Sequence, residues 1–130
     1  MHPLILSGVL LAGASLSAPA VAAPLAPAVE RDLRCFMLYA MGVDQAVKNK
    51  NEKVQQAAGL GLTYFLGKLK VEAPALVLAD AIRQQAESLK DDEATRSAGN
   101  SCDQEFQGAG AEMRNLGQEL TGKSEAAPSK

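Results

Sequence analysis

Apolar residues recur along this chain at intervals of three and four, the spacing that places them on one face of an α-helix. No segment shows the strict alternation of a β-strand. The first stripe consists of Val29, Leu33, Phe36, Ala40, Val43 and Val47. The second consists of Val54, Ala58, Gly61, Phe65 and Leu69. The third consists of Leu78, Ile82, Ala86 and Leu89, and the fourth of Ala98, Cys102, Phe106, Ala109, Met113, Leu116 and Leu120.

Helix-ending residues suggest where the first two helices stop and start. Gly42 is placed to end the first helix as the residue beyond its C-cap. Asn49, with Glu52 three residues later, resembles a capping box and predicts the start of the second helix. The segment from Gly67 to Pro74 interrupts the pattern and separates the second helix from the third.

Two polar sites are candidates for the start of the last helix. Asp91 or Asp92 is one candidate cap, and Asn100 or Ser101 is the other. Residues 121–130 are polar and predict a disordered C-terminal tail. Four helices of 12 to 20 residues with short connections predict an all-α domain over residues 23–120, folded as an antiparallel four-helix bundle.

The second helix is rich in small residues, which weaken its intrinsic helicity. They are Ala57, Ala58, Gly59 and Gly61. We expect them to permit the close approach of a neighbouring backbone. A cofactor cleft is the alternative interpretation of the same residues.

The first 22 residues carry no acidic or basic side chain apart from His2. An apolar block is followed by small residues, and the sequence Ala20-Val21-Ala22 fits the groove of a signal peptidase. This predicts a signal peptide over residues 1–22 that is cleaved after Ala22, and an exported, periplasmic protein. The alternative is a membrane anchor, but the apolar block is too short to cross about 30 Å of hydrocarbon. We do not expect the mature protein to span a membrane.

The chain has two cysteines, Cys35 and Cys102. An even number of cysteines in a small exported domain indicates a disulfide. A bridge across this separation of 67 residues would stabilise the fold by about 4 kcal/mol in the chain-entropy model. Two free thiols are the alternative. We expect the disulfide, which would join the first helix to the last and close the bundle.

Histidine chemistry is excluded from the mature protein, because the only histidine is His2. Catalytic triads, Cys-His pairs and the ordinary histidine zinc sites all need an imidazole. No glycine-rich phosphate-binding loop follows a predicted strand. We therefore predict no catalytic, metal-binding or cofactor-binding residue and expect a protein that is not an enzyme, with carboxylate-only chemistry as the formal exception.

Charge is divided unevenly along the chain, although its net value is only −2. Residues 48–70 hold five lysines and one acid, whereas residues 87–119 hold eight acids and three bases. Neighbouring helices of complementary charge explain this pattern, and a charged surface for a partner is the alternative. The balance argues against a nucleic-acid partner, which needs a clustered basic excess.

Two resemblances concern the region from Arg31 to Cys102. The segments RCFMLYAMG and YFLGKLKVEAP, followed by a second cysteine, resemble those of small exported helical proteins of Gram-negative bacteria. That resemblance implies a fold and a location but no chemistry. More loosely, a cysteine followed by an aromatic residue, with a second cysteine in a later helix, is similar to the periplasmic acid-stress chaperones. No site residue is transferred from either group.

Three functions fit these observations. The first is a non-enzymatic exported helical protein that binds another envelope protein or itself, as an interaction or structural module. The second is an acid-responsive chaperone, which loses stability as its carboxylates are neutralised below about pH 4 and then holds unfolded clients. The third is a carrier of a small apolar ligand, bound between small residues of the second and fourth helices.

Overall fold

A computed structural model describes residues 23–125 of the chain, with side chains described as far as Gly122. It contains α1 (Pro27–Lys48), α2 (Glu52–Glu72), α3 (Leu78–Gln85), the short 3₁₀ helix η1 (Ala86–Leu89) and α4 (Asp92–Glu125). These residues include no strand, so the all-α prediction is confirmed for them. The predicted signal peptide and residues 126–130 of the predicted tail lie outside the described residues.

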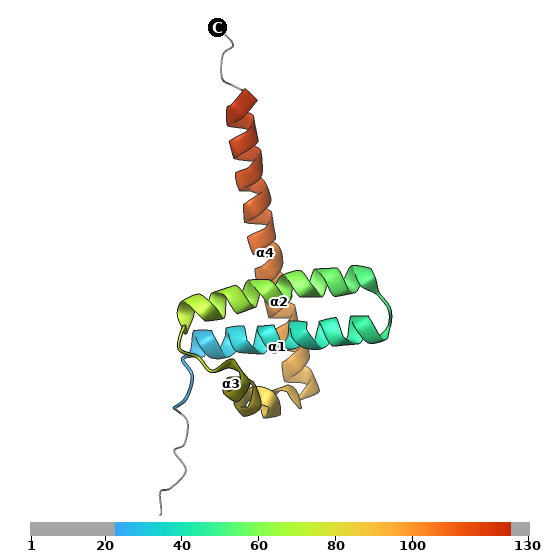
Figure 1. The fold of residues 1–130 in the computed structure, drawn as a ribbon, viewed down its shortest axis with the longest axis vertical. Coiled ribbons are helices and arrows are strands. Elements are labelled where there is room, and N and C mark those ends of the chain that lie inside the picture. Colours follow the sequence, from blue (N-terminus) through green and yellow to red (C-terminus); the bar gives the residue numbers. More distant parts are fainter. Residues whose placement is uncertain (1–22, 126–130) are drawn as a thin grey trace, which may run out of the picture.

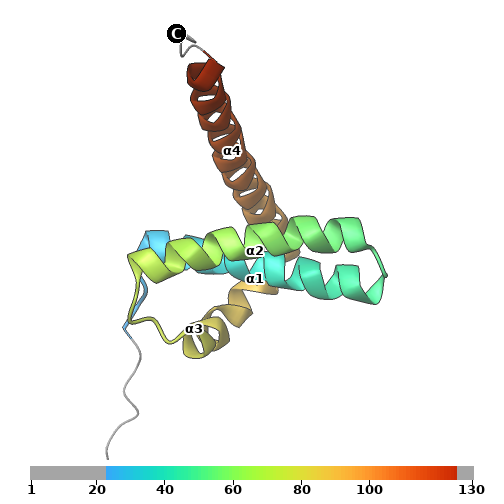
Figure 2. The same cartoon turned by 45° about the horizontal axis from the view of Figure 1, so that its top comes forward.

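The helices form a hairpin crossed by a fourth helix. α1 and α2 lie side by side and antiparallel, and α3 with η1 leads from the end of α2 back beneath the hairpin (Figure 1). α4 crosses the hairpin steeply, and its C-terminal half extends well beyond it (Figure 2). Only α1 and α2 pair along their lengths, so the antiparallel four-helix bundle is not confirmed.

The predicted end of the first helix at Gly42 is wrong, because α1 continues to Lys48. Gly42 lies where α1 and α2 approach each other, and a Cβ atom built on it would stand 3.6 Å from the Cβ of Ala58. That distance is an ordinary van der Waals contact, so Gly42 lies at the contact between two helices rather than at the end of one. Packing along the hairpin therefore outweighs the weak helix propensity of glycine.

The turn between α1 and α2 is shorter than the predicted connector. Lys50 adopts a φ of 54°, in the left-handed region, and this reverses the chain. The N-cap of α2 is Asn51, whose side-chain oxygen accepts a hydrogen bond from the backbone N–H of Val54 at 3.1 Å. The predicted cap at Asn49 is therefore displaced by two residues.

α2 also runs further than predicted. It passes through Gly67 and ends at Glu72, because Leu69 is buried on the same face as the rest of the stripe. The third predicted helix divides into α3 and the 3₁₀ turn that begins at Ala86. The predicted stripe is therefore buried from Ala58 to Leu69 but not at Val54, which is 49% exposed, and the predicted break is several residues too early.

The last helix starts at the first of its two candidate sites. The side chain of Asp91 accepts a hydrogen bond from the N–H of Ala94 at 2.8 Å, and Asn100 and Ser101 lie inside α4. The helix then continues to Glu125, five residues past the predicted end of the domain at residue 120.

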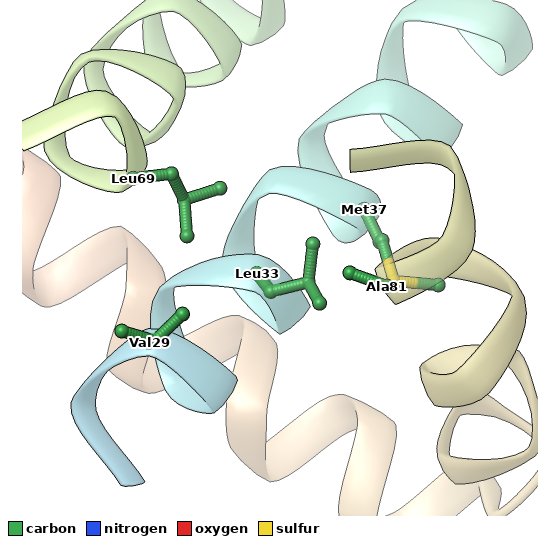
Figure 3. Close-up of a cluster of buried hydrophobic side chains, with 5 residues drawn as sticks. All are labelled: Val29, Leu33, Met37, Leu69 and Ala81. Atoms are coloured by element: carbon green, nitrogen blue, oxygen red, sulfur yellow. The ribbon is translucent and has the colours of Figure 1, made fainter. Parts of the chain in front are cut away.

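One hydrophobic cluster joins α1, α2 and α3 (Figure 3). Its buried members are Val29, Leu33, Met37, Leu69 and Ala81. Partly buried apolar residues of the α2–α3 connection and of η1 pack against them. This cluster keeps α3 against α1 and leaves the remainder of α1 and α2 free to contact α4.

Candidate functional site

The point where α4 crosses the hairpin is fastened by the two cysteines. Cys35 of α1 and Cys102 of α4 are both buried, and their sulfur atoms lie at disulfide distance. Their Cα atoms are 5.5 Å apart, within the usual range for a disulfide. The two predicted residues are therefore brought together, and they connect the first and last helices as expected.

Aromatic rings surround this junction. Phe65 of α2 is completely buried beside the two cysteines. Its ring centroid lies 5.7 Å from that of Tyr39 and 4.9 Å from that of Tyr64. Phe106 of α4 packs against both tyrosines, at 5.7 Å from each. Rings from three helices thus hold α4 at one place on the hairpin.

Gly61 explains the small residues that the sequence places in α2. A Cβ atom on Gly61 would lie 2.2 Å from Cε1 of Tyr39, so the ring occupies the space of the missing side chain. The close approach expected at the small residues of α2 is therefore made by an aromatic side chain at Gly61 and by the neighbouring helix at Ala58, whereas a Cβ atom on Gly59 would meet nothing within 4 Å. Tyr39 also donates a hydrogen bond from its hydroxyl to Oδ1 of Asp103 at 2.7 Å. Burial and this hydrogen bond raise the pKa of Tyr39 above its ordinary value of 10.0.

A cluster of charged groups lies beside the rings. Asp32 of α1 is fully buried, with an exposed fraction of 0%, and Nζ of Lys68 from α2 lies 2.8 Å from its Oδ2. Nζ also donates hydrogen bonds to Oδ1 of Asp32, at 3.0 Å, and to Oε1 of Glu105 from α4. Arg31 adds a contact of 3.2 Å between its Nη2 and Oδ1 of Asp32. These charges connect all three helices.

The ammonium group of Lys68 is held in its charged form by these partners. Burial by itself would lower the pKa of Lys68, but hydrogen bonds to Asp32 and Glu105 outweigh that effect and raise the pKa. The cluster therefore fastens the crossing rather than offering a free base or nucleophile. In residues 23–122, no group of three or more potential ligands could hold a metal ion.

Sequence reasoning missed this cluster, although a signal for it exists. Asp32 precedes Cys35 by three residues and Tyr39 by seven, so the three share one face of α1. A face that carries the disulfide cysteine must turn toward α4. An acid on that face therefore needs a basic partner, and Lys68 is that partner.

Two grooves flank the crossing. A polar groove of about 620 Å³ lies between the start of α1 and the first half of α4, and Arg31, Arg34, Ser97 and Ser101 are among its lining residues. A second groove of about 780 Å³, here termed the apolar groove, lies between α1, α2 and α4. It is lined by Leu38, Tyr39, Gly42, Lys53, Val54, Ala57, Ala58, Gly99, Cys102, Asp103, Phe106 and Gln107.

The C-terminal half of α4 carries apolar residues that the fold leaves uncovered. Met113, Leu116 and Leu120, here termed the distal stripe, have exposed fractions of 76%, 56% and 62%. The prediction that they belong to the core is wrong, because α4 has left the hairpin before it reaches them (Figure 1). Cys102 and Phe106, earlier on the same stripe, do pack against it.

The distal stripe follows a seven-residue repeat. Counting from Phe106, the apolar positions recur at intervals of three and four, as in the a and d positions of a coiled coil. Glutamate precedes each a position, at Glu105, Glu112 and Glu119. Glycine follows each of the first two d positions, at Gly110 and Gly117. This is the pattern of a helix that packs lengthwise against another helix.

Comparisons with protein families, with curated proteins and with solved structures found no match to this chain. Across the described helices, none is both long and apolar enough to cross a bilayer. The candidate site is therefore interpreted from its own geometry, which consists of a fastened crossing, an apolar groove and a projecting helix with an apolar stripe.

Proposed function

We propose that this chain is an exported, non-enzymatic interaction module whose binding surface is the distal stripe. The observation that carries the proposal is the exposure of Met113, Leu116 and Leu120 at heptad positions of a helix that extends beyond the rest of the fold. An apolar stripe of this kind is buried when a second helix packs against it. Contiguous exposed apolar residues commonly mark a protein-binding surface.

The organisation of the crossing supports the same proposal. The disulfide-distance cysteines, the rings around Phe65 and the ion pairs of Lys68 all fasten the N-terminal half of α4. The other half is thereby presented at a fixed place without being covered. Export with cleavage after Ala22 belongs to this proposal, because a bridge between Cys35 and Cys102 forms and persists in an oxidising compartment.

The test uses the mature chain, residues 23–130, in an extract of the cell envelope. A photo-crosslinking amino acid at position 116 is expected to capture one discrete protein, whether another chain or a second copy. The same amino acid at position 118 is the matched control, because Gln118 lies off the stripe on the same exposed half of α4. Equal capture from both positions, or none from position 116, contradicts the proposal.

A second function is favoured by the apolar groove. Its volume of about 780 Å³ lies within the range of small-molecule sites, and Lys53 provides a cation among mostly apolar lining residues. An aliphatic carboxylate is the ligand class that fits this combination. Delipidated protein is expected to melt at a higher temperature with a long-chain fatty acid, and Ala57→Arg is expected to abolish the shift. An unchanged melting temperature of the wild type contradicts this function.

A further inference from the structure

The distal stripe is an exposed apolar helix face, and the apolar groove of the same fold is a concave surface that could accept such a face. We infer that two copies of this chain associate, with the distal stripe of each copy seated in the apolar groove of the other. This inference rests on the proposed function and names its partner as a second copy. The two surfaces lie on a shared helix, carry opposite charges beside them and both contain small residues.

Phe106 lies in the apolar groove and on the same helix face as the distal stripe. It lines the apolar groove, and it also stands one heptad before Met113 on α4. The distal stripe therefore begins seven residues beyond the α4 wall of the groove at Phe106, on the same helix. In a two-fold symmetric pair the two α4 helices pass each other there, and the two contacts merge into one interface. Both uncovered surfaces are then buried by the same association.

The charges beside the two surfaces are opposite. Lys53 lines the groove and Lys50 precedes it, and neither has an ion-pair partner among the side chains of residues 23–122. Glu112 and Glu119 flank the stripe and are likewise without a partner in that part of the chain. Seating the stripe in the groove brings these carboxylates toward the lysines, which favours association.

Pairing of α4 with α4 is the competing arrangement, and the repeat argues against it. In an antiparallel pair, the row formed by Glu105, Glu112 and Glu119 would face the same row of the other copy. In a parallel pair, the row would face Gly110 and Gly117 instead and gain no ionic contact. The α1 and α2 walls of the groove offer Lys53, while Asp103 on its α4 wall accepts the hydrogen bond of Tyr39.

Small residues on both surfaces allow the backbones to approach. On α4, a Cβ atom added to Gly117 would meet no other atom within 4 Å. The groove has Gly42, Ala57 and Gly99 among its walls. A helix can therefore lie deep in the groove, where apolar contact is greatest.

The oligomeric state of the mature chain tests the inference. Sedimentation equilibrium is expected to show a dimer at about 100 μM, within the micromolar range of modest interfaces. Leu116→Glu on the stripe and Ala57→Arg in the groove are each expected to give monomers, whereas Gln118→Glu stays dimeric. All three positions are exposed, so thermal melts are expected to show that the variants fold. A wild-type monomer, or a dimer unaffected by Ala57→Arg, overturns the inference.

Charge exchange tests the predicted register. Lys53→Glu is expected to weaken the dimer about tenfold, and adding Glu112→Lys and Glu119→Lys is expected to recover that loss. Failure of the combined variant to recover any affinity contradicts the assignment of the lysine and the glutamates to one interface.

Crosslinking between copies identifies the surface on which the stripe lies. A photo-crosslinker at position 116, in a mixture with a ¹⁵N-labelled copy, is expected to reach residues 38–58 of the other copy. A crosslink to residues 99–107 of the other α4 is equally compatible with the inference, because these residues form one wall of the groove. A crosslink to residues 113–120 of the other α4 overturns the inference. So does a wild-type monomer whose position 116 captures a different protein, but that result leaves the proposed function standing. A monomer that captures nothing from the envelope contradicts both.

Discussion

Replacing Gly61 with alanine tests the packing at the helix crossing. A Cβ atom at this position would lie 2.2 Å from Cε1 and 2.5 Å from Cδ1 of Tyr39, distances that no real contact tolerates. The ring of Tyr39 must therefore turn away in the Gly61→Ala variant. Its hydrogen bond to Asp103 and its packing on Phe65 and Phe106 would be lost together.

The expected effect is the difference between a gain and several losses. Alanine is favoured over glycine inside a helix by about 1 kcal/mol. Against this gain stand the net value of one hydrogen bond, about 1 kcal/mol, and the aromatic contacts, about 0.5 to 1.5 kcal/mol each. We expect a net destabilisation of about 2 kcal/mol, which corresponds to a melting temperature lower by roughly 10 °C for a domain of this size.

Urea unfolding followed by circular dichroism measures this difference. Gly67→Ala is the matched control, because it lies on the same helix and its added Cβ would meet nothing within 4 Å. We expect Gly67→Ala to stabilise the protein by up to about 1 kcal/mol, so the two substitutions should have opposite signs. An unchanged slope with denaturant would show that both variants unfold as the wild type does.

The result that refutes the reasoning is a Gly61→Ala variant as stable as Gly67→Ala. A double-mutant cycle then locates the cause. In a Tyr39→Ala background the obstruction is absent, so Gly61→Ala is expected to become stabilising. If Gly61→Ala still lowers the free energy of unfolding in the Tyr39→Ala background, the strain does not arise from contact with Tyr39.

Three further measurements test the fastening of the crossing. Lys68→Met leaves Asp32 buried without its main partner, so it is expected to lower the free energy of unfolding in urea by about 3 kcal/mol. Lys70→Met is the exposed control and is expected to change it by no more than about 0.5 kcal/mol. Equal effects of the two substitutions would contradict the role of the ion pairs. Burial and the bond to Asp103 raise the pKa of Tyr39, so the folded state holds this proton more tightly than the unfolded chain. The protonated Tyr39 hydroxyl contributes fully to the free energy of unfolding below about pH 10, and this contribution is lost as the pH rises further. The free energy of unfolding is therefore expected to fall above about pH 10, and to fall less steeply in Tyr39→Phe. A free energy of unfolding that rises above about pH 10 would contradict this role of Tyr39. Non-reducing mass analysis of the mature chain is expected to find no alkylatable thiol, and reduction to lower stability by about 4 kcal/mol; two alkylated cysteines would disprove the bridge.

Most of the stripes of α1 and α2 could be predicted because burial there depends on local periodicity, but Val47 and Val54, next to the turn of the hairpin, are exposed. Leu33, Phe65 and Leu69 are buried as their spacing indicates. The helix ends were less predictable, because glycine usually weakens a helix. Gly42 instead lies inside α1, where it faces Ala58 of α2. Such a glycine looks the same in the sequence whether it ends a helix or packs one.

The candidate site was only partly predictable. The pairing of Cys35 with Cys102 followed from their number and the expected export. The distal stripe was recognised as an apolar face, but periodicity does not indicate whether its partner is the same chain or another. The cluster around Asp32 depends on side chains from two other helices, and their proximity arises only when α4 crosses the hairpin.

The length of α4 beyond the crossing makes the position of its C-terminal end sensitive to the angle at which it crosses the hairpin. From Phe106 to Glu125 the helix continues for 19 residues, or roughly 28 Å at about 1.5 Å per residue. A small rotation of the rings around Phe65 would therefore be magnified at the tip, where a tilt of about 10° corresponds to about 5 Å.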